Sequence, residues 1–351
     1  MPAKRSTPAS GSGLAAVAEC AGVSLATASR VLTGSKHRVS RDLRERVLHA
    51  AETLDYVPNA SARSLSVGMR KIVGVLLHDM VDAQSCDYVR ALEEAADHAG
   101  WLIMLANASR NIEKEFRYLR VFRAERVGAI IFGGTSLDDD EYRARLTREL
   151  NGYVKQGGRV VMSARHGLPF AEFASDSFGG ARAAVEHLFE RGHRRIGIIT
   201  TPRTITGTAE RLAGAKRAFE NHGVPWDETL VVEGDSRRTG GLAGCERLLS
   251  RTPDITGVFA MSDDMAFGVY EAASAHGLRI PMDLSVIGYN DVAMARVLSP
   301  PLTTVSCPTA ELARGAIEAC VGEVALERTQ VVVPSELIVR KSVAAPRGMS
   351  S

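Results

Sequence analysis

The chain has 351 residues, of which 45% are hydrophobic and 24% charged, so it is long enough for two or three domains with full cores. Its five cysteines are scattered without a Cys-x-x-Cys pair, which argues against a disulfide framework or a zinc site. The first residues lack the apolar core of a signal peptide, and no apolar run approaches the roughly 20 residues of a membrane span. We therefore expect a cytoplasmic protein with no membrane partner, no metal and no cofactor.

Charge is distributed unevenly along the chain. The net charge is +2, but residues 1–70 carry ten Lys or Arg residues against five acids, so the remainder is acidic. A small basic segment on a mildly acidic body is typical of a polyanion-binding module joined to another domain. An ordinary solvated surface is the alternative.

After a tail at 1–13 that we expect to be disordered, residues 17–32 (VAECAGVSLATASRVL) predict two short helices. Gly22 favours a tight break between them, because glycine adopts left-handed backbone angles at little steric cost. Ser24 is placed to cap the second helix. Two such helices around a glycine turn indicate a helix-turn-helix, whereas a plain helical hairpin is the alternative.

A third amphipathic helix is predicted from Ser40 to about Leu54, which would give the segment a minimal core. Pro58 then ends the regular pattern, and Asn59 is a good helix cap before residues 60–65. A helix so short is unstable alone because nucleation is costly, so we expect it to form only when docked and to be a linker otherwise.

From residue 72 onwards, apolar strands alternate with amphipathic helices in two runs. We expect strands at 72–77, 101–106, 128–134 and 159–163, then at 195–200, 229–234, 257–262 and 283–289. The intervening helices are predicted near 89–99, 113–124, 141–156, 180–191, 208–222, 240–250 and 264–276. Uniformly apolar strands separated by helices indicate two doubly wound α/β subdomains with parallel sheets. Ligands of such sheets bind at the carboxyl ends of the strands, so the cleft between subdomains is the expected pocket.

Two other functional classes share this alternating pattern. A nucleotide-dependent enzyme needs a glycine-rich phosphate loop after the first strand, and IVGVLLHDM has one glycine, inside the strand. GxxxxGK[ST], GxSxG and HExxH are absent from the sequence, so we predict no catalytic residues. A periplasmic-type solute-binding protein remains an alternative, but it would need export and no basic head.

Seven motifs then occur in a characteristic order. They are VAECAGVSLATASRVL, YVPNASARSL, EHLFERGHRRIGII, ERLAGAKRAF, SDDMAFGVYEA, SVIGYNDVAMARVLSPPLTTV and PSELIVRKS. With them the chain resembles the LacI/GalR family of bacterial transcription regulators. The resemblance implies a sequence-specific regulator, most often a repressor, that binds double-stranded operator DNA as a homodimer. A small molecule would control its DNA affinity.

The same resemblance implies the domain boundaries. The head would span 14–58, the hinge 59–70 and the effector-binding and dimerisation core 71–342, with a core resembling periplasmic binding proteins. Within the core, the N-subdomain would comprise about 71–172 plus 306–332, and the C-subdomain about 173–305 plus 333–342. The tail at 343–351 is too short for a C-terminal helical extension of the kind that builds tetramers, so we predict a dimer.

For DNA, the resemblance makes Ser24 to Arg30 the recognition helix. The contacts it implies are Ser24, Leu25, Ala26, Thr27, Ser29 and Arg30 on that helix, and Asn59, Ala62 and Leu65 in the hinge. Arg30 would bind guanine, and Leu65 would wedge between base pairs in the minor groove.

For the effector, the resemblance and the strand ends point to the cleft residues Asp79, Arg165, Arg211, Ser262, Asp263, Asn290 and Asp291. Arg211 matches a ligand-binding arginine, although a salt bridge with Glu210 or Asp263 is the competing interpretation. Ala164 stands where sugar-responsive relatives have an aspartate, and AQSC at 83–86 replaces their usual aromatic pair. A sugar, a sugar acid or a related metabolite therefore stays open, as does a corepressor-dependent regulator with a non-sugar metabolite.

Overall fold

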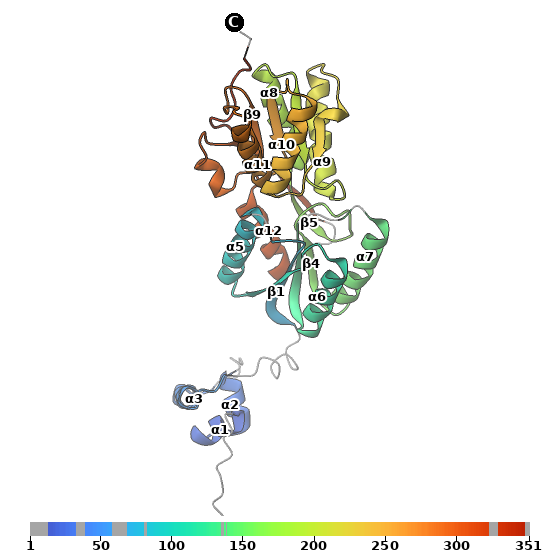
Figure 1. The fold of residues 1–351 in the computed structure, drawn as a ribbon. Coiled ribbons are helices and arrows are strands. Elements are labelled where there is room, and N and C mark those ends of the chain that lie inside the picture. The colour runs from blue at the N-terminus through green and yellow to red at the C-terminus, as the bar shows by residue number, and fades with distance from the viewer. Residues whose placement is uncertain are drawn as a thin grey trace, which may run out of the picture. The chain divides into compact units, whose positions relative to one another are not determined.

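The computed structural model describes residues 13–32, 39–57, 69–80, 83–134, 137, 139–322 and 329–347. The chain divides into two compact units, Met1–Arg70 and Lys71–Ser351, hereafter the head and the core unit (Figure 1). The predicted hinge contacts Asn59, Ala62 and Leu65 lie outside the described residues. Among the described residues no single helix is long and apolar enough to cross a membrane. The bent pair Leu14–Cys20 and Leu25–Leu32 meets the criteria of length and composition only when the two helices are taken together.

The head consists of three short helices around a small apolar core. They are α1 (Leu14–Cys20), α2 (Leu25–Leu32) and α3 (Arg41–Thr53). Ser40 caps α3 as predicted, since its side chain accepts a hydrogen bond from the Leu43 N–H at 3.4 Å. The buried side chains are only alanines and valines, among them Val17, Ala28 and Val47. Such small side chains let three short helices approach closely, but each contributes little buried area.

The core unit contains two six-stranded sheets, each covered by helices on both faces. The first has the order β11-β5-β4-β3-β1-β2, with β1 (Arg70–Leu77), β2 (Leu102–Asn107), β3 (Val127–Gly133), β4 (Arg159–Met162), β5 (Ala171–Ser175) and β11 (Gln330–Val333). The pairs β1–β2, β3–β4, β4–β5 and β5–β11 are parallel. Helices α5 (Ala83–His98) and α12 (Thr309–Val321) lie on one face, and α6 (Ile112–Ala124) and α7 (Asp140–Val154) on the other (Figure 1).

The second sheet has the order β12-β10-β9-β8-β6-β7. Its strands are β6 (Ile196–Thr200), β7 (Val231–Glu233), β8 (Gly257–Ala260), β9 (Ser285–Asn290), β10 (Thr303–Ser306) and the short β12 (Leu337–Ile338), which is antiparallel to β10. Its helices are α8 (Ser177–Glu190), α9 (Thr206–Asn221), α10 (Arg238–Arg251) and α11 (Asp263–Ala275), with the 3₁₀ turns η1 (Glu228–Leu230) and η2 (Ala293–Arg296).

This architecture confirms the predicted α/β class, although β5, β10 and β11 were not among the predicted strands. β5 was not predicted, because AEFAS is short and has a glutamate as its second residue. Glu172 is nonetheless 3% exposed, and its carboxylate accepts hydrogen bonds from the backbone N–H groups of His166 and Gly167. Since β5 belongs to the first sheet, the first crossing between the sheets follows Ser175, slightly later than the expected boundary at about 172.

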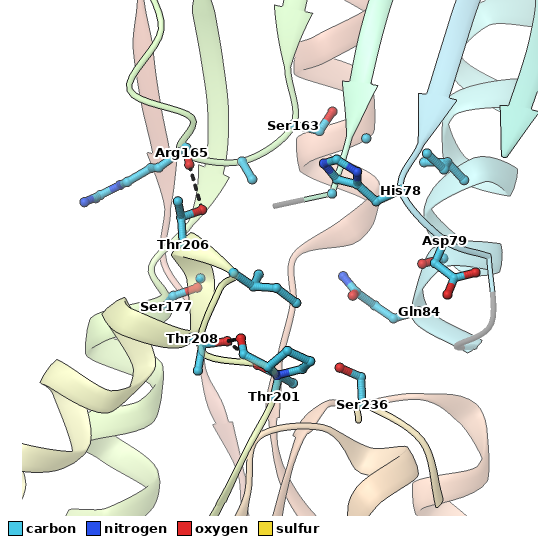
Figure 2. Close-up of a pocket in the computed structure, with 18 of the residues that line it drawn as sticks. His78, Asp79, Gln84, Ser163, Arg165, Ser177, Thr201, Thr206, Thr208 and Ser236 are labelled. Atoms are coloured by element: carbon cyan, nitrogen blue, oxygen red, sulfur yellow. Dashed lines mark hydrogen bonds between the residues drawn. The ribbon is translucent and has the colours of Figure 1, made fainter. Parts of the chain in front are cut away.

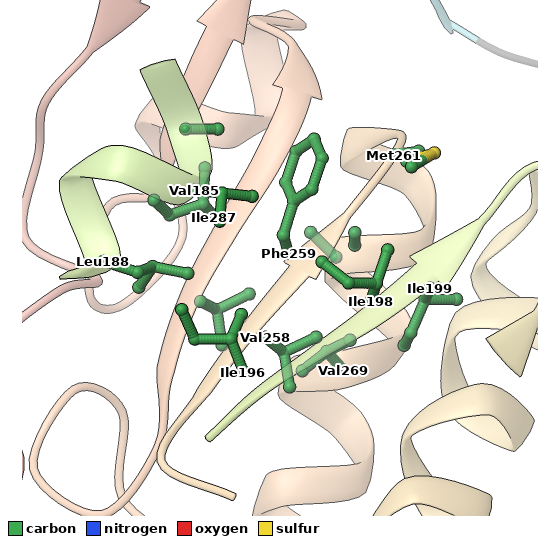
Figure 3. Packing of buried hydrophobic residues seen from close by; sticks show 14 of the residues in the cluster. Val185, Leu188, Ile196, Ile198, Ile199, Val258, Phe259, Met261, Val269 and Ile287 are labelled. Carbon is green, nitrogen blue, oxygen red and sulfur yellow. The ribbon is translucent and has the colours of Figure 1, made fainter. Parts of the chain in front are cut away.

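The strands of the second sheet are buried on both faces, as the continuous apolar runs predict. In Figure 3, Ile196 and Ile287 lie towards Val185 and Leu188 of α8, whereas Val258, on the opposite face of the sheet by its register, lies near Val269 of α11. Each such side chain, once fully buried, contributes about 1.5–3 kcal/mol to stability. The sheet is therefore a rigid platform for the loops at its carboxyl edge.

Helices α10 and α11 pack so closely that glycine is required at their contact. A Cβ on Gly241 would lie 2.0 Å from the Met265 carbonyl oxygen, and one on Gly268 would lie 2.1 Å from that of Arg238. Both obstacles are backbone atoms, which cannot move aside by a rotamer change.

We expect Gly241→Ala to lower the free energy of unfolding by about 1–3 kcal/mol, because the added methyl group forces the two helices apart. Gly152→Ala in α7 is the matched control, since its Cβ would have only ordinary contacts beginning at 3.7 Å. That variant should be neutral or more stable by about 0.5–1 kcal/mol. Chemical denaturation of both variants measures the difference, and equal stabilities would contradict the packing argument.

Candidate functional site

Hydrogen bonds from within the turn and from α3 stabilise the turn between α1 and α2. Gly22 has φ +62°, the left-handed conformation expected of it, and its N–H donates to the Glu19 carbonyl oxygen at 3.0 Å. From α3, the Arg46 guanidinium donates to the Ala21 carbonyl oxygen at 2.5 Å. Arg46 thereby satisfies a carbonyl left free at the end of α1 and fixes the angle at which α2 leaves the turn.

Helix α2 has one buried and one exposed face. Ser24 caps it as predicted, accepting from the Thr27 N–H at 3.2 Å. Ala28 and Val31 are buried against the head core. The predicted DNA contacts Ser24, Leu25, Ala26 and Arg30 lie exposed on the helix, whereas Thr27 and Ser29 are half-buried. Leu25 is 54% exposed, and an apolar side chain at the start of such a helix can contact a thymine methyl group in the major groove.

In the core unit, a cavity of about 410 Å³ lies between the carboxyl edges of the two sheets. His78, Asp79, Ser163 and Arg165 follow strands of the first sheet, and Thr201 follows β6 of the second (Figure 2). The cavity therefore occupies the place that the parallel topology predicts. Its wall is rich in hydroxyl groups: Ser85, Ser163, Ser175, Ser177, Thr201, Thr204, Thr206, Thr208, Ser236 and Ser262.

Five of the seven predicted effector residues line this cavity: Asp79, Arg165, Arg211, Ser262 and Asn290. The side chain of Arg165 nevertheless extends away from the other labelled side chains in Figure 2. It makes an ion pair with Glu210 at 3.4 Å, and burial raises the pKa of Glu210 while Arg165 lowers it. Arg165 thus lies on the rim of the cavity.

Asp263 and Asp291 do not line this cavity, contrary to expectation. Asp263 is fully buried and accepts hydrogen bonds from the Val292 N–H at 2.9 Å and the Thr304 hydroxyl at 2.5 Å. Burial raises its pKa to about 6. Asp291 lies in an adjacent groove, paired with Arg340 at 2.5 Å and with a second arginine. Both carboxylates are therefore used within the protein, and their hydrogen bonds and ion pairs hold the loop after β9 in place.

Arg211 on α9 makes neither of the salt bridges considered for it. One of its Nη atoms donates to the Met261 carbonyl oxygen at 2.6 Å, and its guanidinium carbon lies 3.9 Å from the centre of the Tyr289 ring. Its Nε is buried without an acceptor among the described residues. The aromatic face and the carbonyl fix the plane of the guanidinium, which leaves its positive charge available to a ligand.

A hydrogen-bonded triad on the cavity wall was not predicted. Glu115, 1% exposed, accepts from the Tyr142 hydroxyl at 2.6 Å and lies 3.0 Å from Nδ1 of His78. His78 and Glu115 both line the cavity. His78 ends its strand as Asp79 does, so the strand-end rule could have found it. Glu115 and Tyr142 sit on the helical faces of α6 and α7, where no local pattern distinguishes them from surface polar residues.

The core unit has two halves, one built on each sheet, and several contacts join them around the cavity. Asp79 forms ion pairs with Arg110 at 3.3 Å and with Arg237 of the second half at 3.6 Å. The Thr206 hydroxyl donates to the Arg165 carbonyl oxygen at 3.2 Å (Figure 2). A ligand in the cavity therefore touches the groups that determine how the two halves meet.

Two family models match this chain. Residues 14–59 match the bacterial regulatory proteins of the lacI family, and residues 185–343 match a periplasmic binding protein-like domain. Over 93% of this chain and 95% of the relative, it is 34% identical to the transcriptional regulator GalS of Salmonella typhimurium. The chain belongs to the lacI family. It is a DNA-binding transcriptional repressor with an effector-binding core, and it is not an enzyme.

Three further regulators are similar to this chain along nearly its whole length. The chain is 34% identical to the transcriptional repressor PurR of Escherichia coli, over 93% of this chain and 96% of the relative. A structure of the Lac repressor bound to ONPG in the repressed state is 25% identical with a TM-score of 0.83, covering 94% and 99% of the two chains. The regulator CelR in complex with cellobiose is 32% identical with a TM-score of 0.69, at the same coverage.

Acidification should destabilise the core unit through His166, which is 1% exposed. Burial lowers the pKa of His166 from 6.5 to about 4, so between these values the unfolded chain takes up a proton that the native protein excludes. The stability due to the neutral ring is complete above pH 6.5 and is lost as the pH falls towards 4. As the pH falls from 6.5 towards 4, the free energy of unfolding of the His166→Gln variant should decrease by up to about 3 kcal/mol less than that of the wild type.

Urea unfolding at a series of pH values measures this slope. His276→Gln is the control, because His276 is exposed at the end of α11. The variant should keep the wild-type slope. A His166→Gln slope equal to that of the wild type would show that other groups carry the acid response.

Proposed function

We propose that this regulator binds a two-fold-related operator as a homodimer, and that a small molecule in the cleft controls its operator affinity. The observation that carries the proposal is the 410 Å³ cavity between the two sheets, whose lining includes Asp79, a residue that bridges both halves. A ligand that binds one arrangement of the halves more tightly stabilises that arrangement. A coupling of roughly 1–3 kcal/mol is enough for regulation.

The DNA contacts are proposed on the exposed face of α2. Ser24 to Arg30 would enter the major groove, with Arg30 on a guanine and Leu25 against a thymine methyl group. The hinge residues Asn59, Ala62 and Leu65 would dock in the minor groove, with Leu65 as the wedge. A periplasmic-type solute-binding protein would not explain residues 14–59, which match the lacI family.

Exposed apolar side chains support a dimer. Leu102 and Leu105 are 70% and 40% exposed on β2, which is an edge strand of the first sheet. Met294 and Val297, at 54% and 73%, are exposed at η2 beside the second sheet. Apolar groups in such numbers on one core unit suit contact with a second copy. A closed two-fold dimer would pair the same surface on each subunit.

We expect Arg30→Ala to weaken specific operator binding by about 1–3 kcal/mol, because a bidentate arginine–guanine contact is lost. Leu65→Ala should lower specific affinity more than non-specific affinity. Titration of intergenic DNA upstream of the gene, in gel-shift assays at two salt concentrations, separates these effects. If both variants footprint like the wild type, the proposed docking is wrong.

Replacing both Leu102 and Leu105 with aspartate should shift the dimer towards monomer, since a carboxylate buried at the interface without a partner is unfavourable. Sedimentation equilibrium at micromolar concentration measures this, with Val121→Asp as the control on α6, where Val121 is 45% exposed. We expect the control to remain dimeric. A stable tetramer in the wild type, or a dimer in the double variant, would contradict this assembly.

A further inference from the structure

The carboxylates that line the cavity are already bound to partners within the protein. Asp79 is held by Arg110 and Arg237, Glu115 by His78 and Tyr142, and Glu210 by Arg165 (see the contacts above). These three are the only acids among the described lining residues. A neutral polyol is normally recognised by carboxylates that accept from its hydroxyl groups, and here each of those carboxylates already has an ion-pair or hydrogen-bond partner within the protein.

Arg211 is in the opposite situation. Among the described residues it is the lining arginine without a carboxylate within 4 Å, whereas Arg110 and Arg165 each have one. Its contacts, the Met261 carbonyl and the Tyr289 ring, orient the guanidinium but do not neutralise it. Its buried Nε also lacks an acceptor. A half-buried cation with unused donors is favourable only if an anion or water completes its hydrogen bonding.

The groups around Arg211 in the cavity are neutral. Ser262, Asn290 and Cys307 line the same region, and burial raises the pKa of the Cys307 thiol, which keeps it uncharged. Ala164, which has no polar side chain, also lines the cavity. An anionic group placed against Arg211 would therefore meet its positive charge, because Glu210, the carboxylate that also interacts electrostatically with Arg211, is paired with Arg165.

We propose that the effector carries an anionic group, a carboxylate or a phosphate, that binds the guanidinium of Arg211, with a hydroxyl-bearing body held by the serines and threonines of the cavity. This inference rests on the proposed function, since it specifies the ligand of the same cleft. The planar guanidinium matches two oxygens of a carboxylate or phosphate. The hydroxyl-rich wall offers both donors and acceptors to the rest of the ligand.

Isothermal titration calorimetry on the full chain tests the proposal with matched probes. Glucuronate and glucose, galacturonate and galactose, and glucose 6-phosphate and glucose differ within each pair by an anionic group at the same carbon, and inorganic phosphate is the minimal anion. We expect at least one anion to bind ten or more times tighter than its neutral counterpart. The pair that shows the effect distinguishes a carboxylate from a phosphate.

The variants locate the effect. Arg211→Met should abolish the preference for the anion, and Arg211→Lys should retain part of it, because the charge remains but the fork is lost. Arg217→Met is the matched control on α9, where Arg217 is exposed and paired with Glu220. It should bind as the wild type does. Thermal unfolding of each variant shows whether it is folded. If Arg211→Met does not fold, Arg211→Lys still tests the proposal.

Two results would overturn the proposal. One is a neutral sugar that binds as tightly as its acid. The other is a panel in which no anion, inorganic phosphate included, binds in an Arg211-dependent way. If a neutral ligand binds the cleft and changes operator affinity, the inference fails but the proposed function stands. If a ligand saturates the cleft and operator affinity never changes, it is the proposed function that fails.

Discussion

The core unit depends on how its chain passes between two parallel sheets. It crosses after β5, between β10 and α12, and again between β11 and β12, so the two halves are tethered at one place by three strands of backbone. Three short crossings prevent the halves from separating but leave rotation about the crossings possible. The carboxyl ends of the parallel strands face the space beside these crossings, which is why the cavity is located there. Ligand binding and relative rotation are thus determined by the same geometry.

Electrostatics in the cleft follows from this tethering. Two ion pairs, Asp79 with Arg237 and Arg165 with Glu210, span the two halves beside the cavity. An ion pair that is half exposed contributes at most about 1 kcal/mol, so it biases the arrangement without locking it. Arg211, fixed within one half by Met261 and Tyr289, keeps the same orientation whether or not the other half moves. The bridging contacts are therefore weak, whereas the proposed ligand-binding group is rigid.

The sequence was sufficient for most strands because continuous apolar runs have one simple explanation, burial on both faces of a sheet. It failed at β5, where burial of Glu172 depends on backbone donors in the preceding loop that no local pattern reveals. At the site, the strand-end rule placed Asp79, Ser262 and Asn290 on the cavity. It could not show that Asp263 points into the protein interior. Ser262 and Asp263 are neighbours at the start of α11, and the orientation of Asp263 depends on its hydrogen bond with Thr304, which is distant in the sequence.

The head shows the opposite balance between local and tertiary information. Gly22 and Ser24 determine a turn and a cap almost alone, but the angle between α1 and α2 also needs Arg46, which is 24 or more positions away in the sequence. The core behind them is made of alanines and valines, and a core so small contributes only a few kcal/mol against the conformational entropy of ordering three helices. Contact with DNA can supply the missing stabilisation.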